Sequence, residues 1–287
     1  MDVRNNNDKV AFMKRLKNYY ENEILVFEKS LDTHNDHDFI MKLQEWLSIW
    51  VAYNARFNQV INIDGKFDDK TEDAVMAFQK FAKIDATGAI NKETWDKITT
   101  PMRKAFEIKT YPFGHDDIAA RVSHYAFQYE KWRPYEIDPN FGPWVRSFMD
   151  GHDGEKWAWC AGFVQTVLDS VFSDLEIPYT KYFKKTYRVE EMRVDARDKG
   201  VLHDNKSILN GTYKPKQGDI FVIIYDGDTI AHHTGIITAL KDASFLTIEG
   251  NTNFIGSNNG VGVFRLERNF KKINIEVIES PVSLSDL

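Results

Sequence analysis

The chain has 287 residues, of which 43% are hydrophobic and 28% charged, and its net charge is −6. This length is long for one domain and sufficient for two. The negative charge argues against a nucleic-acid partner, which needs a basic face for the phosphates. No apolar run approaches the roughly 18 residues of a membrane-spanning helix.

The N-terminal segment is polar and charged. We expect a helical extension over residues 1–37, because Phe12, Leu16 and Tyr19 follow helical spacing. The segment has neither the apolar core nor the small-residue cleavage site of a Sec signal.

The segment 38–105 predicts a domain of three helices. The first apolar run at helical spacing contains Ile40, Leu43, Leu47, Trp50 and Val51. An Asp-Gly turn follows at 62–67. Asp69 is the expected N-cap of the second helix, with Glu72 completing a capping box. A short third helix, KETWDKI, is expected to end at Pro101.

A linker is expected at 106–114, and a second domain at 115–287. Asp116 or Asp117 is expected to cap a long helix that follows, and Pro143 fits the first turn of a short one. Next comes an apolar stripe of Phe163, Val164, Val167, Leu168 and Val171. This stripe places Cys160 at or near the N-terminus of a helix.

The last third of the chain predicts β-strands. Five runs are rich in β-branched and aromatic residues and are separated by short turns: 219–225, 233–240, 244–249, 261–266 and 273–279. Consecutive strands with short connections predict an antiparallel meander. Helices followed by strands make the predicted fold class α+β, with helices packed on an antiparallel sheet.

The stretch EKWAWCAGFV contains Cys160, the only cysteine of the chain, which excludes an internal disulfide. A lone cysteine is most often a small buried hydrophobic residue. A helix start, however, stabilises a thiolate through the helix dipole and its free N–H groups. The two flanking tryptophans fit a groove wall and core packing equally well.

Candidate partners for a nucleophilic cysteine lie in two neighbouring predicted strands. Such a site needs a histidine base and a third group that orients the imidazole. His233 begins one strand, and Glu249 and Asn251 end the next. In a hairpin that turns about Lys241, His233 and Glu249 are opposite one another and share a face. The alternative for His233 is an ordinary histidine at the edge of a strand.

The sequence offers no metal or cofactor motif, and we expect neither. There is no HExxH, and one cysteine cannot form CxxC. The segment around Asp64 and Gly65 resembles a calcium loop, but alignment puts Val60 at the first ligand position. The same alignment puts Thr71 where the last position needs glutamate.

Four blocks resemble the CHAP amidase/peptidase family over residues 115–280: WAWCAGFV, YKPKQGDIFVI, HHTGIITA and TIEGNTN. The resemblance implies a papain-like α+β domain in which the cysteine opens a helix and the histidine begins a strand. It implies Cys160 as nucleophile, His233 as base and Glu249 as the residue that orients the imidazole. Asn251 would be a polar assistant, and His232 a bystander.

The N-terminal domain is similar to the three-helix peptidoglycan-binding domain of wall hydrolases. The matching blocks are LQEWL, DGKF, KTEDAVMAFQKF and TGAINKETW. The family pattern has glycine after the phenylalanine, where this chain has Asp68. The resemblance implies peptidoglycan as the partner.

The two resemblances predict a peptidoglycan hydrolase of phage or bacterial type that acts as a monomer. It would cut an amide bond, either the muramoyl-alanine linkage or a bond of the stem or cross-bridge. Without a Sec signal, we expect synthesis in the cytoplasm and delivery through a holin or a secretion machine. The alternatives are a non-catalytic wall-binding protein and a cysteine protease that acts on protein.

Overall fold

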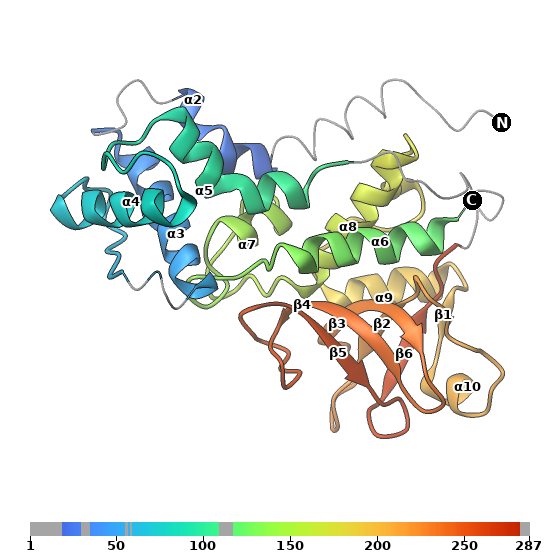
Figure 1. Ribbon diagram of the computed structural model, residues 1–287. Helices are drawn as coiled ribbons and strands as arrows, with labels where there is room; N and C mark the ends of the chain where they lie inside the picture. Colours follow the sequence, from blue (N-terminus) through green and yellow to red (C-terminus); the bar gives the residue numbers. More distant parts are fainter. Residues whose placement is uncertain (1–18, 30–34, 55–56, 58, 109–116, 282–287) are drawn as a thin grey trace.

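The computed structural model describes residues 19–29, 35–54, 57, 59–108 and 117–281 (Figure 1). Helices make up the N-terminal part, and a six-stranded antiparallel sheet, with helices on it, makes up the C-terminal part. The predicted α+β class is therefore confirmed. None of the helices within the described ranges is long and apolar enough to cross a membrane.

The N-terminal part contains the three predicted helices. Residues 19–24 are helical and precede α2 (Val26–Lys29), α3 (His37–Tyr53), α4 (Asp69–Ala82) and α5 (Lys92–Ala105). Most of the extension predicted at 1–37 lies outside the described residues. So do residues 109–116, which include most of the predicted linker and Asp116.

Two helix boundaries differ from the prediction. The N-cap of α4 is Asp68 rather than Asp69, because the Asp68 carboxylate accepts a hydrogen bond from the Thr71 backbone N–H at 3.0 Å. The third helix, α5, does not end at Pro101 but continues for another turn. Met102, which is fully buried, packs into the core there, and this packing outweighs the missing N–H of the proline.

Two buried glutamines hold the turns of this domain. The side-chain oxygen of Gln44 accepts hydrogen bonds from the backbone N–H groups of Asp64 at 3.0 Å and Gly65 at 2.9 Å. Gln79 does the same for Gly88 at 2.9 Å. Both glycines have positive φ, +70° and +78°, which a side chain would strain. Each turn is therefore fixed by a helix that lies next to it.

The C-terminal part begins with helices. These are α6 (Ile118–Lys131), α7 (Pro143–Phe148), α8 (Cys160–Asp174), the 3₁₀ helix η1 (Tyr179–Lys181), α9 (Val189–Asp198) and α10 (Asn205–Leu209). Asp117 caps α6 by accepting from the Ala120 N–H at 2.8 Å. Pro143 occupies the first turn of α7, as predicted.

The sheet differs from a simple meander. Its strands are β1 (Leu202–His203), β2 (Ile220–Ile223), β3 (His233–Leu240), β4 (Phe245–Thr252), β5 (Gly262–Arg268) and β6 (Ile275–Ile278). The order is β1-β6-β2-β3-β4-β5, and all pairs are antiparallel. Strands β2 to β5 form the predicted meander, but β6 returns to pair with β2. This pairing satisfies the backbone groups of β2 that a meander would leave at an edge.

Helix α8 packs on β3 and β4, and α6 lies beside α8 (Figure 1). Gly250 of β4 makes this contact close, because a Cβ atom there would meet Phe163 of α8 at 2.5 Å. Gly162 has the same effect on the other side of α8, where a Cβ atom would meet the Phe148 carbonyl oxygen at 2.5 Å. The start of α8, which carries Cys160, is thus held between α7 and the sheet.

The helical domain packs directly on the C-terminal domain, and buried apolar residues of both form one core. Trp46 of α3 meets Trp144 of α7 with ring centroids 6.2 Å apart. The Trp144 indole N–H donates to the Tyr53 hydroxyl at 3.0 Å. Phe106, just after α5, meets Tyr129 of α6 with centroids 5.2 Å apart. The two domains are therefore not joined by the linker alone.

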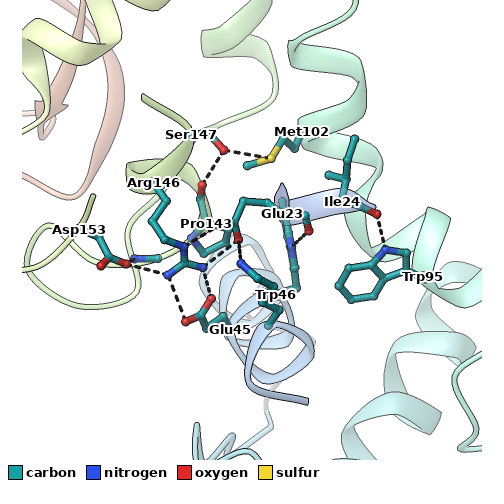
Figure 2. A network of polar contacts seen from close by, with 12 residues as sticks. Glu23, Ile24, Glu45, Trp46, Trp95, Met102, Pro143, Arg146, Ser147 and Asp153 are labelled. Atoms are coloured by element: carbon teal, nitrogen blue, oxygen red, sulfur yellow. Dashed lines mark hydrogen bonds and ion pairs between the residues drawn. The ribbon is translucent and has the colours of Figure 1, made fainter. Parts of the chain in front are cut away.

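A buried ionic network lies in this interface (Figure 2). Arg146 of α7 donates two hydrogen bonds of 2.9 Å to Glu23, which precedes α2. The same guanidinium pairs with Glu45 of α3 and with Asp153 at 2.7 Å. Lys42 adds a second cation to Glu23 at 2.7 Å. The network thus joins the N-terminal segment, the helical domain and the loop that leads to Cys160.

Replacing Arg146 by glutamine is expected to lower the free energy of unfolding by about 3–5 kcal/mol, because Glu23 and Glu45 would stay buried without their shared cation. The measurement is urea denaturation at neutral pH. The control is Arg197→Gln, which replaces an exposed arginine near the end of α9 and is expected to change stability by less than about 0.5 kcal/mol. A loss below about 1 kcal/mol for Arg146→Gln would show that the network is not a structural element.

Candidate active site

Cys160 is the first residue of α8 and is 2% exposed. The N-cap position is Trp159, whose side chain makes no capping hydrogen bond. The backbone N–H groups of the first turn are therefore not satisfied by a capping side chain. Free N–H groups and the helix dipole favour negative charge at this point, both on a thiolate and on an oxyanion.

His233 and Glu249 form a buried pair beside the nucleophile candidate. His233 is the first residue of β3, and its Nε2 lies 2.7 Å from a carboxylate oxygen of Glu249 in β4. Both side chains are fully buried. Within the described part of the chain, Nδ1 of His233 has no nitrogen or oxygen partner, and Cys160 is the other side chain that interacts with this imidazole. Because Nε2 is taken by Glu249, Nδ1 is the nitrogen available to the thiol.

The register of the hairpin differs from the prediction. The turn comprises residues 241–244 and is closed by a hydrogen bond of 2.8 Å from the Lys241 N–H to the Ser244 oxygen. Its centre therefore lies beyond Lys241. Ile236 pairs with Ile248, and this register continued puts Gly235, not His233, opposite Glu249.

Gly235 explains how His233 and Glu249 still meet, although they are not directly opposite one another. A Cβ atom at this position would lie 2.6 Å from Cγ of Glu249 and 2.8 Å from the Phe221 ring. The absence of a side chain lets the Glu249 carboxylate lie across the strand toward His233. The two side chains share a face, as predicted, although they are offset by two residues.

Two further residues hold the Glu249 carboxylate. Arg268, at the end of β5, donates from Nε at 2.8 Å and from a terminal nitrogen at 2.5 Å, one bond to each oxygen. The hydroxyl of Thr247 donates to the same carboxylate at 2.5 Å. A bidentate guanidinium fixes both the plane and the position of a carboxylate. Glu249 can therefore hold the imidazole in one orientation.

The surroundings of His233 and Glu249 favour a charged imidazolium–carboxylate pair. Burial alone lowers the pKa of His233, but Cys160 and Glu249 outweigh it and raise this pKa from 6.5 to about 9. Burial alone raises the pKa of Glu249, but Arg268 and His233 lower it from 4.5 to about 2. Protonated His233 therefore stabilises the fold. This contribution is complete below pH 6.5 and is lost as the pH rises through about 9. The carboxylate contributes above pH 4.5, and its contribution is lost as pH falls through 2.

Asn251 is buried but occupies a different position from Glu249. Its amide oxygen accepts from the Trp159 N–H at 3.2 Å, and its nitrogen donates to the Gly260 oxygen at 2.9 Å. Its φ is +53°, a left-handed conformation that asparagine tolerates. No hydrogen bond to His233 is present among the described residues. Asn251 therefore ties the end of β4 to the residue that precedes Cys160.

The neighbouring histidine is outside this group. His232 is exposed, and its Nε2 lies 3.1 Å from Asp228. Since alternate residues of a strand face opposite ways, His232 and His233 cannot both face the sheet interior. The bystander role that the family resemblance implies for His232 stays a prediction.

Arg268 was missed by the sequence reasoning, although the strand carries a signal. In β5, exposed Arg265 and Glu267 alternate with the more buried Phe264 and Leu266. Arg268 continues the inward row. A charged residue in the inward row of a strand requires a buried partner. Here the partner is Glu249.

If this site is an active site, replacing Arg268 by glutamine is expected to lower its catalytic rate about 10- to 100-fold, because Glu249 loses its bidentate support. The pKa of Glu249 would rise, so the acid limb of the pH–rate profile would move to higher pH. Arg268→Lys keeps the charge without the fork and is expected to be intermediate. The control is Arg265→Gln, which removes an exposed arginine of the same strand. An unchanged profile in Arg268→Gln would contradict the positioning role.

A groove opens at the nucleophile candidate. It has a volume of about 470 Å³, and Cys160 and Ala158 belong to its lining. Residues 187–191 form one wall, and residues 230–232 form the other. Within the described residues, no group of three or more His, Cys, Asp or Glu side chains is placed to hold a metal ion.

Comparison with known proteins finds one similarity, in the helical domain. Residues 36–98 match the family model described as "Putative peptidoglycan binding domain". This match supports an association of the chain with the cell wall. No curated protein and no solved structure matches the chain.

Proposed function

We propose that this protein is a cysteine-dependent hydrolase of peptidoglycan amide bonds. The observation that carries the proposal is the buried His233–Glu249 pair, whose imidazole also interacts with Cys160 at a helix start. The second support is the peptidoglycan-binding family match at 36–98. The polymer bound by such a domain is also a substrate with amide bonds.

In the proposed mechanism, Nδ1 of His233 takes the proton of the Cys160 thiol. The thiolate attacks the carbonyl carbon of the scissile amide, and the N–H groups at the start of α8 stabilise the oxyanion. His233 then gives its proton to the leaving amine, which leaves a thioester on Cys160. A water molecule, deprotonated by His233, attacks the thioester and releases the acid.

The partners of His233 have separate roles. Glu249 holds the imidazole with Nδ1 toward the thiol and stabilises the imidazolium that forms at each proton transfer. Arg268 keeps this carboxylate ionised and in place. Asn251 fixes the Trp159 backbone and with it the position of Cys160.

Purified sacculi test the proposal. Release of soluble muropeptides with new amino termini is the expected result, and mass spectrometry of these termini identifies the bond that is cut. Sedimentation with sacculi without release would indicate a wall-binding protein. Neither binding nor release would favour a protease that acts on protein. An enzyme of this kind meets its substrate outside the cytoplasm, so delivery through a holin or a secretion machine is part of the proposal.

A further inference from the structure

The groove at Cys160 is preformed by a second ionic network. Arg193 of α9 donates two hydrogen bonds, of 2.7 and 2.8 Å, to Glu276 of β6. It also donates to Glu190 at 3.2 Å and to the Thr229 oxygen at 3.2 Å. Glu190 in turn accepts from the Ala231 N–H at 2.7 Å. These bonds fix the two walls relative to one another, so little ordering entropy remains to be lost on binding.

The acidic residues of the groove are engaged within the fold. Arg193 and the Ala231 N–H occupy the carboxylate of Glu190. Glu191 accepts from the Thr186 hydroxyl at 2.9 Å and pairs with Lys184 at 3.2 Å. Both carboxylates therefore have internal partners, and neither is left to attract a cation from solution.

Arg188, unlike Glu190 and Glu191, has no close ionic partner among the described residues. Its side chain is 82% exposed, and its ionic contact among the described residues is with Glu191 at 4.0 Å, the limit for such a pair. It is the one lysine or arginine in the described lining of the groove. Arg188 thus belongs to the same lining as Cys160, and its N–H donors have little competition from partners within the fold. A planar guanidinium with free donors is suited to bind a carboxylate through two bonds.

We propose that this groove binds the peptide part of the wall polymer through a free carboxylate on Arg188. Stem peptides are suitable ligands, because they carry a free carboxylate on D-glutamate and another at the C-terminus. Ile230, which is 46% exposed, offers apolar surface for the small side chains of such a peptide. This inference rests on the proposed substrate class but not on cleavage itself.

Binding in the Cys160→Ala background tests the groove without turnover. The probes are a fluorescent stem peptide with both carboxylates free and the same peptide with both converted to carboxamides. Anisotropy is expected to show about tenfold tighter binding of the acid, the effect of one charged hydrogen-bonded contact. Arg188→Gln is expected to remove this preference, and Arg188→Lys to keep part of it. Arg197→Gln, at the exposed far end of α9, is the control and should leave it unchanged.

The outcomes separate this inference from the proposed function. Equal binding of the two peptides, or binding of neither, would overturn the inference whatever the chain with Cys160 does to sacculi. An acid preference that depends on Arg188, together with no release from sacculi, would support the groove and refute the hydrolase. Release from sacculi, together with no effect of Arg188→Gln on peptide binding, would support the hydrolase and refute the role of Arg188 in the groove.

Discussion

Replacing Cys160 by serine is expected to abolish release of muropeptides from sacculi, with a loss of roughly 10³-fold or more. A serine hydroxyl ionises far less readily than a thiol at neutral pH. The surroundings described here, a helix start and an imidazolium, suit a thiolate. Binding to sacculi should persist, because the family match at 36–98 does not include the nucleophile.

The measurement compares the initial rate of muropeptide release and sedimentation with sacculi for the parent chain and the variant. Thermal unfolding shows whether the variant keeps its fold, which we expect because the exchange of sulfur for oxygen is small. His233→Ala is expected to cause a similar loss. His203→Ala, which removes a partly buried histidine of β1 outside the site, is the matched control. Lysis near the parental rate by Cys160→Ser would refute the nucleophile assignment.

Local patterns were sufficient to predict the elements that carry the site. The β-branched run at 233–240 has the bounds of β3, and the apolar stripe after Cys160 placed this residue at the start of α8. Both patterns involve only residues that are close together in the sequence, within a single strand or a few turns of one helix. The shared face of His233 and Glu249 also followed from strand parity, which a shift by two residues leaves unchanged.

Contacts between distant segments could not be predicted in this way. The ion pair of Arg146 with Glu23 joins residues 123 positions apart, and no local pattern indicates it. The hairpin register depends on a turn that closes between Lys241 and Ser244, so its centre lies between residues 242 and 243, beyond the predicted centre at Lys241. The groove requires α9 and the segment before β3 to lie side by side, which only the tertiary structure shows.

The sequence offers two candidates for the third residue of the proposed catalytic group, and the geometry favours Glu249. Its carboxylate contacts His233 directly, whereas the Asn251 amide contacts Trp159 and Gly260. Glu249→Gln is therefore expected to lower the rate by about 10² or more, because the amide cannot stabilise the imidazolium. Glu249→Asp, which keeps the charge, should recover part of the rate.

For Asn251 the suitable replacement is glycine. The residue has a φ of +53°, where alanine would add backbone strain to the loss of the amide. Asn251→Gly is expected to lower the rate less than Glu249→Gln does. It acts through the position of the Cys160 backbone, so the titration of His233 should stay as in the parent chain.

The pH dependence distinguishes the two roles. Burial opposes the charged imidazole, while Cys160 and Glu249 hold the pKa of His233 at about 9. Removing the negative charge of Glu249 must lower this pKa, so the imidazolium is lost at lower pH and the alkaline limb of the pH–rate profile moves down. An NMR titration of His233 in both variants, alongside the profiles, measures this directly. If Asn251→Gly moves the His233 pKa and Glu249→Gln does not, the orienting residue is Asn251 and the assignment of Glu249 is wrong.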